Sequence, residues 1–101
     1  MVMEDSVKHV EGKNIGHVMM YALSTCVWCK KTKALLDSLG LEYSYVDVDL
    51  LTGEERTRFA NEVGRWNPNR SFPTIVVNDS AVIVGYDELK LNSLAKGQGV
   101  A

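Results

Sequence analysis

The chain has 101 residues and is poor in the residues that can fix an architecture alone, with only two cysteines, two prolines and two histidines. Two cysteines form at most one disulfide, which excludes a disulfide-stapled secreted scaffold. Its apolar runs are too short to cross a bilayer, and the N-terminus lacks the apolar core of a signal peptide. The sequence therefore predicts a cytoplasmic protein without a membrane partner.

An excess of charge of one sign is also missing. Eleven basic and 13 acidic side chains leave a formal net charge of −2, so the sequence offers no strong positive potential to attract nucleic acid. A hydrophobic content of 46% allows one core, and the length is too small for two ordinary domains. We expect one domain, monomeric, that binds no nucleic acid.

The first half of the chain predicts two strands around a helix. Residues 17–23 form a compact apolar run, typical of a strand buried on both faces. Residues 30–39 predict a helix that stops at Gly40. Its apolar stripe consists of Leu35, Leu36 and Leu39. Residues 42–50 alternate apolar and polar side chains and predict a second strand, for which an edge position would suit the acids.

A second helix and a hairpin are predicted next. Thr52 and Glu55 fit a capping box, and Gly64 is the expected end of the helix that they begin. Its expected buried residues are Phe59, Ala60 and Val63. Residues 65–73 hold both prolines and read as a loop. Two short apolar runs on either side of residues 78–80 then predict a hairpin.

A final helix is predicted to begin after Asp87 as its cap and to end at Gly97. Its candidate buried residues are Leu89, Leu91 and Leu94. The order is βαβαββα, which predicts an α/β fold with a mixed sheet and helices on its faces.

Both cysteines lie at the junction between the first strand and the first helix. Cys26 precedes the predicted helix and Cys29 falls in its first turn. Backbone N–H groups and the helix dipole stabilise a thiolate at such a terminus, so we assign Cys26 as the nucleophile. Residues three apart in a first turn are close enough for a disulfide, so Cys29 is assigned as the resolving thiol.

The cysteines have two other interpretations, a structural zinc site and an inert buried pair. Structural zinc needs four ligands, and the remaining two would be His9 and His17 or would come from a second chain. Neither histidine has finger-like spacing, so we expect both at the surface and assign no metal ligand. Inert buried cysteines would not require a strand-to-helix turn around them.

Three stretches carry a family resemblance: "CVWC" at 26–29, "SFPT" at 71–74 and "VGYDEL" at 84–89. In this order, residues 17–96 resemble the glutaredoxin branch of the thioredoxin superfamily. The resemblance implies a thioredoxin-like fold with a mixed four-stranded sheet flanked by helices. It also implies a thiol–disulfide oxidoreductase of cell redox homeostasis that needs no bound cofactor.

The resemblance divides the chain into three parts. Residues 1–16 are a polar arm or an extra short strand, residues 17–97 form the glutaredoxin-like domain, and residues 98–101 are a tail.

The same resemblance implies a substrate-binding surface. Pro73 would be a cis-proline facing the cysteines, and Phe72 would offer its backbone to the substrate like an added strand. Val27 and Trp28 stand where glutaredoxins commonly carry Pro-Tyr, and redoxins that serve ribonucleotide reductase also vary these positions. Leu23 stands where many glutathione-using members have a lysine.

Contacts to glutathione are suggested by a second stretch. Gly85, Tyr86 and Asp87 match most of the family's Gly-Gly-x-Asp stretch, which helps hold the γ-glutamyl end of glutathione, although Val84 replaces the first glycine. Asp87 is explained equally well as a helix cap. Further candidates for carboxylate contacts are Lys30, Arg65 and Arg70.

The two tryptophans have different expected roles. Trp28 is expected to contact partner proteins, and the alternative is a side chain folded back over the neighbouring loop. Trp66 is expected to pack against the loop before Pro73.

The function expected from these residues is reduction of protein or glutathione mixed disulfides by a dithiol pair. Either glutathione or a thioredoxin-type reductase would supply the electrons. The alternative is a dimeric module that binds an iron–sulfur cluster through Cys26 of each chain and glutathione thiols. The presence of Cys29 argues for the dithiol cycle.

Overall fold

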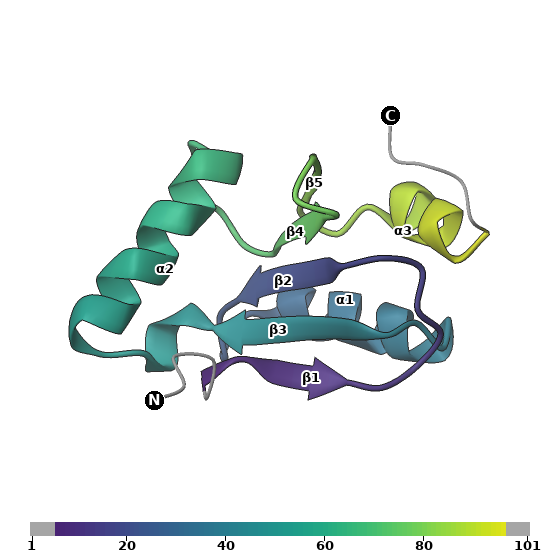
Figure 1. Ribbon diagram of the computed structural model, residues 1–101, viewed down its shortest axis with the longest axis horizontal. Helices are drawn as coiled ribbons and strands as arrows, with labels where there is room; N and C mark the ends of the chain where they lie inside the picture. Colours follow the sequence, from purple (N-terminus) through teal and green to yellow (C-terminus); the bar gives the residue numbers. More distant parts are fainter. Residues whose placement is uncertain (1–5, 97–101) are drawn as a thin grey trace.

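A computed structural model describes residues 6–96, which form a five-stranded mixed sheet with helices on both faces (Figure 1). The strands are β1 (Lys8–Val10), β2 (Val18–Ala22), β3 (Tyr43–Asp47), β4 (Thr74–Val77) and β5 (Ala81–Val84). The helices are α1 (Val27–Ser38), the 3-10 turn η2 (Val48–Leu50), α2 (Gly53–Trp66) and α3 (Glu88–Ala95). The thioredoxin-like α/β fold expected from the sequence is confirmed.

The sheet has the strand order β1-β3-β2-β4-β5. Strand β2 is parallel to β3, with Met20 opposite Tyr45, and antiparallel to β4, with Met20 opposite Ile75. Helix α1 makes the crossover between the two parallel strands, and Gly40 follows it with a φ of 69°, a left-handed conformation that favours glycine. Because β1 pairs antiparallel with β3, the sheet has one strand more than the four expected.

Two hydrophobic cores lie on opposite faces of the sheet. Alternate residues of β2 face opposite sides, so Met20 joins the core with α1 and α3, whereas Tyr21 joins the core with α2. All five residues of β2 are buried, which explains the continuous apolar run. Leu36 of α1 and Leu91 of α3 are fully buried in the first core. Helix α2 contributes Phe59 and Val63 to the second core.

The boundaries of the second strand and second helix correct the sequence predictions. The second strand ends at Asp47, because residues 48–50 form η2. The edge position expected for β3 is occupied by β1. Thr52 is the N-cap of α2, but its side chain makes no capping hydrogen bond, so the predicted capping box is wrong. Glu55 instead accepts a hydrogen bond from the Ser6 hydroxyl at 2.9 Å, because the N-terminal segment lies against the start of α2. The helix continues past Gly64 to Trp66.

Helix α3 is only partly as predicted. Leu91 and Leu94 are buried, but Leu89 is 83% exposed, because the helix turns this position to solvent. The expected helix end at Gly97 and the tail at 98–101 lie outside the described residues. Within residues 6–96, every helix is too short or too polar to span a membrane.

Leu36 and Leu89 provide a matched test of this packing. Leu36→Ala should lower the free energy of unfolding by about 2–5 kcal/mol, because it leaves a cavity between α1 and the sheet. Leu89→Ala should change it by less than about 0.5 kcal/mol. Urea unfolding monitored by circular dichroism measures both, and equal losses would contradict this arrangement of the core.

Candidate active site

Several loops converge at one end of the sheet, where strand β2 ends. Strand β2 leads from this end to the cysteines. Near its last residue, Tyr21 pairs with Thr74 at the start of β4. Pro73 precedes Thr74, and Thr74 also pairs with Val84 at the end of β5. The sheet therefore brings the cysteine turn, the proline loop and the segment after β5 to the same end of the strands.

The cysteine turn begins helix α1. Cys26 is the N-cap, with an extended backbone (φ −82°, ψ 117°), and its Sγ accepts a hydrogen bond from the Cys29 N–H at 3.1 Å. Both cysteines are free thiols; Cys26 is half-buried and Cys29 is buried. The structure thus places Cys26 just before the helix and Cys29 in its first turn, as the sequence predicted.

The environment of Cys29 favours the protonated thiol. Burial, followed by the hydrogen bond with Cys26, raises the pKa of Cys29 to about 12. The negative charge of Asp47, at the end of β3, adds to the rise in this pKa. Asp47 Oδ1 is buried and has no hydrogen-bond partner among the described residues. At neutral pH, Cys29 is therefore a neutral thiol under the turn.

The proline loop carries the cis bond that the family resemblance implied. The Phe72–Pro73 peptide bond is cis, and the Pro73 carbonyl accepts a hydrogen bond from the Gly85 N–H at 2.8 Å. This bond ties the loop to the segment after β5. Gly85 has a φ of 80°, which favours glycine at this position.

Asn67 holds the proline loop in place. Its buried side chain donates Nδ2 hydrogen bonds to the Ser71 carbonyl at 3.2 Å and to Thr74 Oγ1 at 3.1 Å. Sequence reasoning missed this residue, because an asparagine before a proline signals only a turn. Trp66, directly before Asn67, packs against the second core, which lies between α2 and the sheet.

An exposed apolar surface adjoins Cys26. Val27 is 61% and Trp28 is 54% exposed. The Trp28 and Tyr86 rings lie 5.7 Å apart, and Lys31 Nζ lies 5.0 Å from the Trp28 ring centroid. Val27, Trp28 and Tyr86, called the Trp28 surface below, were all expected at the site, whereas Lys31 was not singled out. Lys30 is exposed on α1.

A hollow of about 210 Å³ lies near the loops before Cys26 and Pro73. It is lined by Leu23, Val48, Asp49, Arg56, Ala60, Val63, Arg70 and Phe72. Arg70 was a candidate in the sequence, and Arg56 was missed because it lies on α2, far from the motifs. Arg65 lies instead over the Trp66 ring, 5.7 Å from its centroid.

Asp87 caps α3. Its carboxylate accepts a hydrogen bond from the Lys90 N–H at 3.1 Å, which confirms the capping role that the sequence suggested. Its expected contact with glutathione stays a prediction.

Asp49 fixes the loop that leads to Cys26. The Ser24 hydroxyl and N–H donate hydrogen bonds to its carboxylate at 2.6 and 2.8 Å. These bonds, with the hydroxyl contributing most, lower the pKa of Asp49.

The histidines lie at the other end of the sheet from the cysteines. His17 precedes β2 and Cys26 follows it, so the five residues of β2, about 17 Å of extended chain, separate them. His9 is opposite Ser44 on β3, and Ser44 is opposite Met19 near the start of β2. The alternative of a zinc site that joins these histidines to the cysteines of the same chain is therefore wrong.

A family model for glutaredoxin matches residues 18–82. The chain belongs to the glutaredoxin family. Glutaredoxin 1 of Rickettsia prowazekii is 35% identical over 78 residues, covering 76% of this chain and 78% of the relative. As a glutaredoxin with a Cys-x-x-Cys redox centre, the chain is a thiol–disulfide oxidoreductase.

Two solved glutaredoxin-like structures are closely similar. The glutaredoxin of Methanosarcina mazei Go1 is 52% identical, with a TM-score of 0.81 over 89% of this chain and 88% of that one. The Methanosarcina acetivorans methanoredoxin is 49% identical, with a TM-score of 0.80 over 83% of this glutaredoxin and 88% of that chain. The family-model match over residues 18–82 includes both the cysteine turn and the proline loop.

Alkylation tests the difference between the two thiols. Cys29→Ser and Cys26→Ser each leave one thiol, so each rate belongs to one residue. At pH 7 the Cys26 thiol should react with iodoacetamide at least about tenfold faster, because Cys29 is buried and its pKa is raised. Equal rates would contradict the assignment of Cys26 as the reactive thiol.

The Ser24–Asp49 contact predicts a pH dependence of stability. A lowered pKa favours the carboxylate in the folded state, so the stabilisation is present above the ordinary pKa of about 3.9 and is lost as pH falls through the folded value. Ser24→Ala should raise the pKa of Asp49 and lower stability at pH 7 more than at pH 3. An NMR titration of the Asp49 carboxyl checks this, with Ser38→Ala as a control that removes a serine hydroxyl bonded elsewhere.

Proposed function

We propose that this chain reduces glutathione mixed disulfides and protein disulfides in a dithiol cycle, with Cys26 as nucleophile and Cys29 as resolving thiol. The observation that carries the proposal is the asymmetry of the pair. A half-buried Cys26 sulfur accepts the Cys29 N–H at the helix N-terminus, and the Cys29 thiol lies buried beneath the turn. A cysteine in the first position is stabilised as a thiolate and is accessible to a second molecule.

The cycle consists of two exchanges. The Cys26 thiolate attacks one sulfur of the substrate disulfide, forms a mixed disulfide and releases the other sulfur as a thiolate. Cys29 then gives its proton to solvent and attacks Cys26 Sγ; the bond between Cys26 and the substrate sulfur breaks, the second substrate thiolate leaves, and the Cys26–Cys29 disulfide forms. The substrate gains two electrons, and two glutathione molecules or a reductase return the pair to the dithiol.

The Trp28 surface supports protein disulfides as substrates. Exposed aromatic side chains with apolar neighbours are enriched where proteins bind each other. Val27, Trp28 and Tyr86 offer such a surface beside the nucleophile. The backbone of Phe72, directly before Pro73, would pair with an extended substrate segment.

The arginine-lined hollow supports glutathione as a small substrate. Arg56 and Arg70 line it together with Leu23 and Phe72, next to the loops before Cys26 and Pro73. Guanidinium groups bind carboxylates in a planar, two-bond geometry, and glutathione carries two carboxylates. Arg56 and Arg70 would thus supply the positive charge that a lysine provides in many glutathione-using members, at the position where this chain has Leu23. Gly85 and Asp87, across the site, would contact the γ-glutamyl end.

The proposal assigns this activity to the unit over residues 17–97, to whose sheet residues 8–10 add the short strand β1. The protein would act as a monomer in the cytoplasm, where reducing systems keep a cysteine pair in the dithiol form. It would need no bound cofactor.

Steady-state reduction of a small glutathione mixed disulfide tests the electron donor. Turnover is expected with glutathione and its reductase, and Arg70→Ala should raise KM at least about tenfold while kcat changes little, since a charged hydrogen bond to the substrate is worth about 1.5–3 kcal/mol. Arg65→Ala is the matched control and should leave KM unchanged, because Arg65 lies over Trp66. Turnover only with a thioredoxin-type reductase would exclude glutathione as donor and leave Asp87 as a helix cap alone.

The same assay separates the roles of the cysteines. Cys26→Ser should abolish reduction, whereas Cys29→Ser should accumulate a mixed disulfide that mass spectrometry detects. An absorption spectrum addresses the alternative function: a brown, dimeric protein would favour the iron–sulfur module over the dithiol enzyme.

A further inference from the structure

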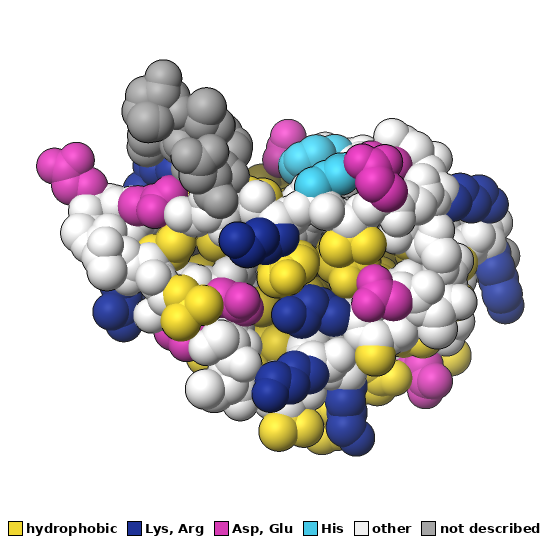
Figure 2. Space-filling model, turned by 90° about the horizontal axis from the view of Figure 1, so that it is seen from below, with side chains coloured by type: hydrophobic (Ala, Val, Ile, Leu, Met, Phe, Trp, Pro, Cys, Tyr) yellow, Lys and Arg dark blue, Asp and Glu magenta, His cyan; other side chains and the backbone are white. Residues whose placement is uncertain are grey.

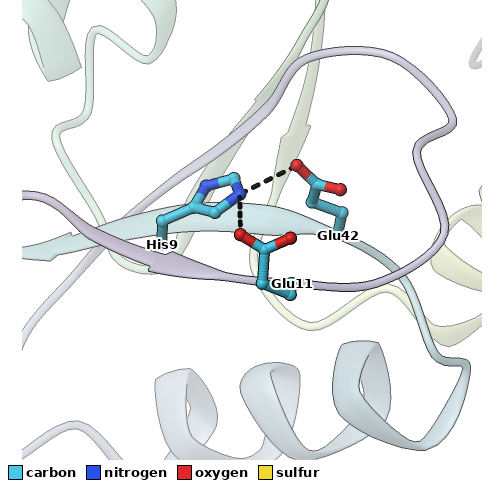
Figure 3. Close-up of side chains that lie close together, drawn as sticks. All are labelled: His9, Glu11 and Glu42. Atoms are coloured by element: carbon cyan, nitrogen blue, oxygen red, sulfur yellow. Dashed lines mark hydrogen bonds and ion pairs between the residues drawn. The ribbon is translucent and has the colours of Figure 1, made fainter.

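A cluster of metal-ligating side chains lies on the β1–β3 side of the sheet, away from the cysteines. His9 comes from β1, Glu11 follows this strand, and Glu42 directly precedes β3. One ligand atom from each of the three lies within 4.8 Å of the others. Figure 3 shows the His9 ring nitrogen facing both carboxylates, and Figure 2 shows histidine and acidic side chains together on this side of the molecule.

The distances suit a small divalent cation. His9 Nε2 is 2.8 Å from Glu42 Oε2, in a hydrogen bond that a cation would replace, and 3.7 Å from Glu11 Oε2. Tetrahedral zinc with ligands at about 2.0–2.1 Å holds its ligand atoms about 3.3 Å from one another, which lies between these two distances. Small rotations of Glu11, whose side chain is 89% exposed, would complete the geometry.

Ser44 orients the imidazole for such a role. His9 Nδ1 lies 2.9 Å from Ser44 Oγ, on the strand paired with β1. Without a metal, Nε2–H donates to Glu42; when a cation takes the place of this proton and Nδ1–H donates to Ser44, the lone pair of Nε2 and the carboxylate oxygens of Glu11 and Glu42 face the same place. A cation there satisfies all three, and metal-ligating histidines are commonly fixed in this way through their second nitrogen.

The surroundings provide rigidity and access. Glu42 is anchored by its backbone N–H, which donates to the Lys13 carbonyl at 2.9 Å. A hollow of about 240 Å³, lined by His9, Glu42 and His17 among others, lies alongside and leaves room for water ligands. Two carboxylates and a neutral imidazole would balance the charge of a 2+ ion.

We propose that His9, Glu11 and Glu42 bind one zinc-like divalent transition-metal ion, with water in the remaining coordination positions. A nitrogen ligand with two carboxylates favours zinc over magnesium or calcium, which take mostly oxygen ligands. The ion would join β1 to the start of β3 and so fasten the N-terminal strand to the sheet. The site is independent of the redox function proposed for the cysteines.

The test uses the full, untagged chain with Cys26→Ser and Cys29→Ser, because thiols bind zinc themselves. Competition with a chromophoric chelator should show one Zn²⁺ bound per chain, and thermal unfolding with Zn²⁺ should occur at a higher temperature than with Mg²⁺. His9→Gln and Glu42→Gln should each weaken zinc binding at least about tenfold. His17→Gln is the matched control and should retain the affinity.

Replacement of Zn²⁺ by Co²⁺ gives a second readout. Visible absorption of bound Co²⁺ should appear in the parent and be lost in His9→Gln, while circular dichroism checks that the variant remains folded. Three results would overturn the proposal: no zinc uptake by the parent, equal uptake by His9→Gln, or an equal loss of binding in His17→Gln.

Discussion

The hydrogen bond from the Cys29 N–H to Cys26 Sγ depends on a helix that starts directly after a buried strand. Strand β2 is buried on both faces, so its end is held rigidly, and α1 begins at Val27, five residues beyond Ala22. Helix α1 is fixed in turn by Leu36 in the core. Packing far from the thiols thus sets the position of the helix N-terminus, where backbone donors favour a thiolate.

The other side of the site depends on a polar network in place of apolar packing. Asn67 ties the helix end of α2 to Ser71 and Thr74, and the Pro73 carbonyl is bonded to Gly85. The proline loop is therefore connected both to α2 and to the segment after β5. Buried polar groups with satisfied hydrogen bonds define one conformation, because every alternative leaves a donor or acceptor without a partner.

Sequence patterns predicted the features that local chemistry determines. Buried β2, the cysteine turn and the Asp87 cap follow from apolar periodicity and from side chains that bond to nearby backbone, so each could be recognised within a few residues. Leu89, Glu55 and Arg56 could not be recognised in this way. Leu89 fits an apolar stripe but faces solvent, Glu55 bonds to Ser6, and Arg56 reaches the site from another helix. These outcomes depend on how separate elements pack.

The raised pKa of Cys29 would order the two steps of the proposed cycle. In the dithiol, burial and the hydrogen bond with Cys26 keep Cys29 protonated, so it does not compete for substrate. Once Cys26 is joined to a substrate sulfur, its sulfur can carry no charge, so both its Coulombic effect and its hydrogen bond on Cys29 would weaken. Burial would remain, but the pKa of Cys29 would fall relative to the dithiol. In the proposed cycle, Cys29 would therefore become a better nucleophile once there is a mixed disulfide to resolve.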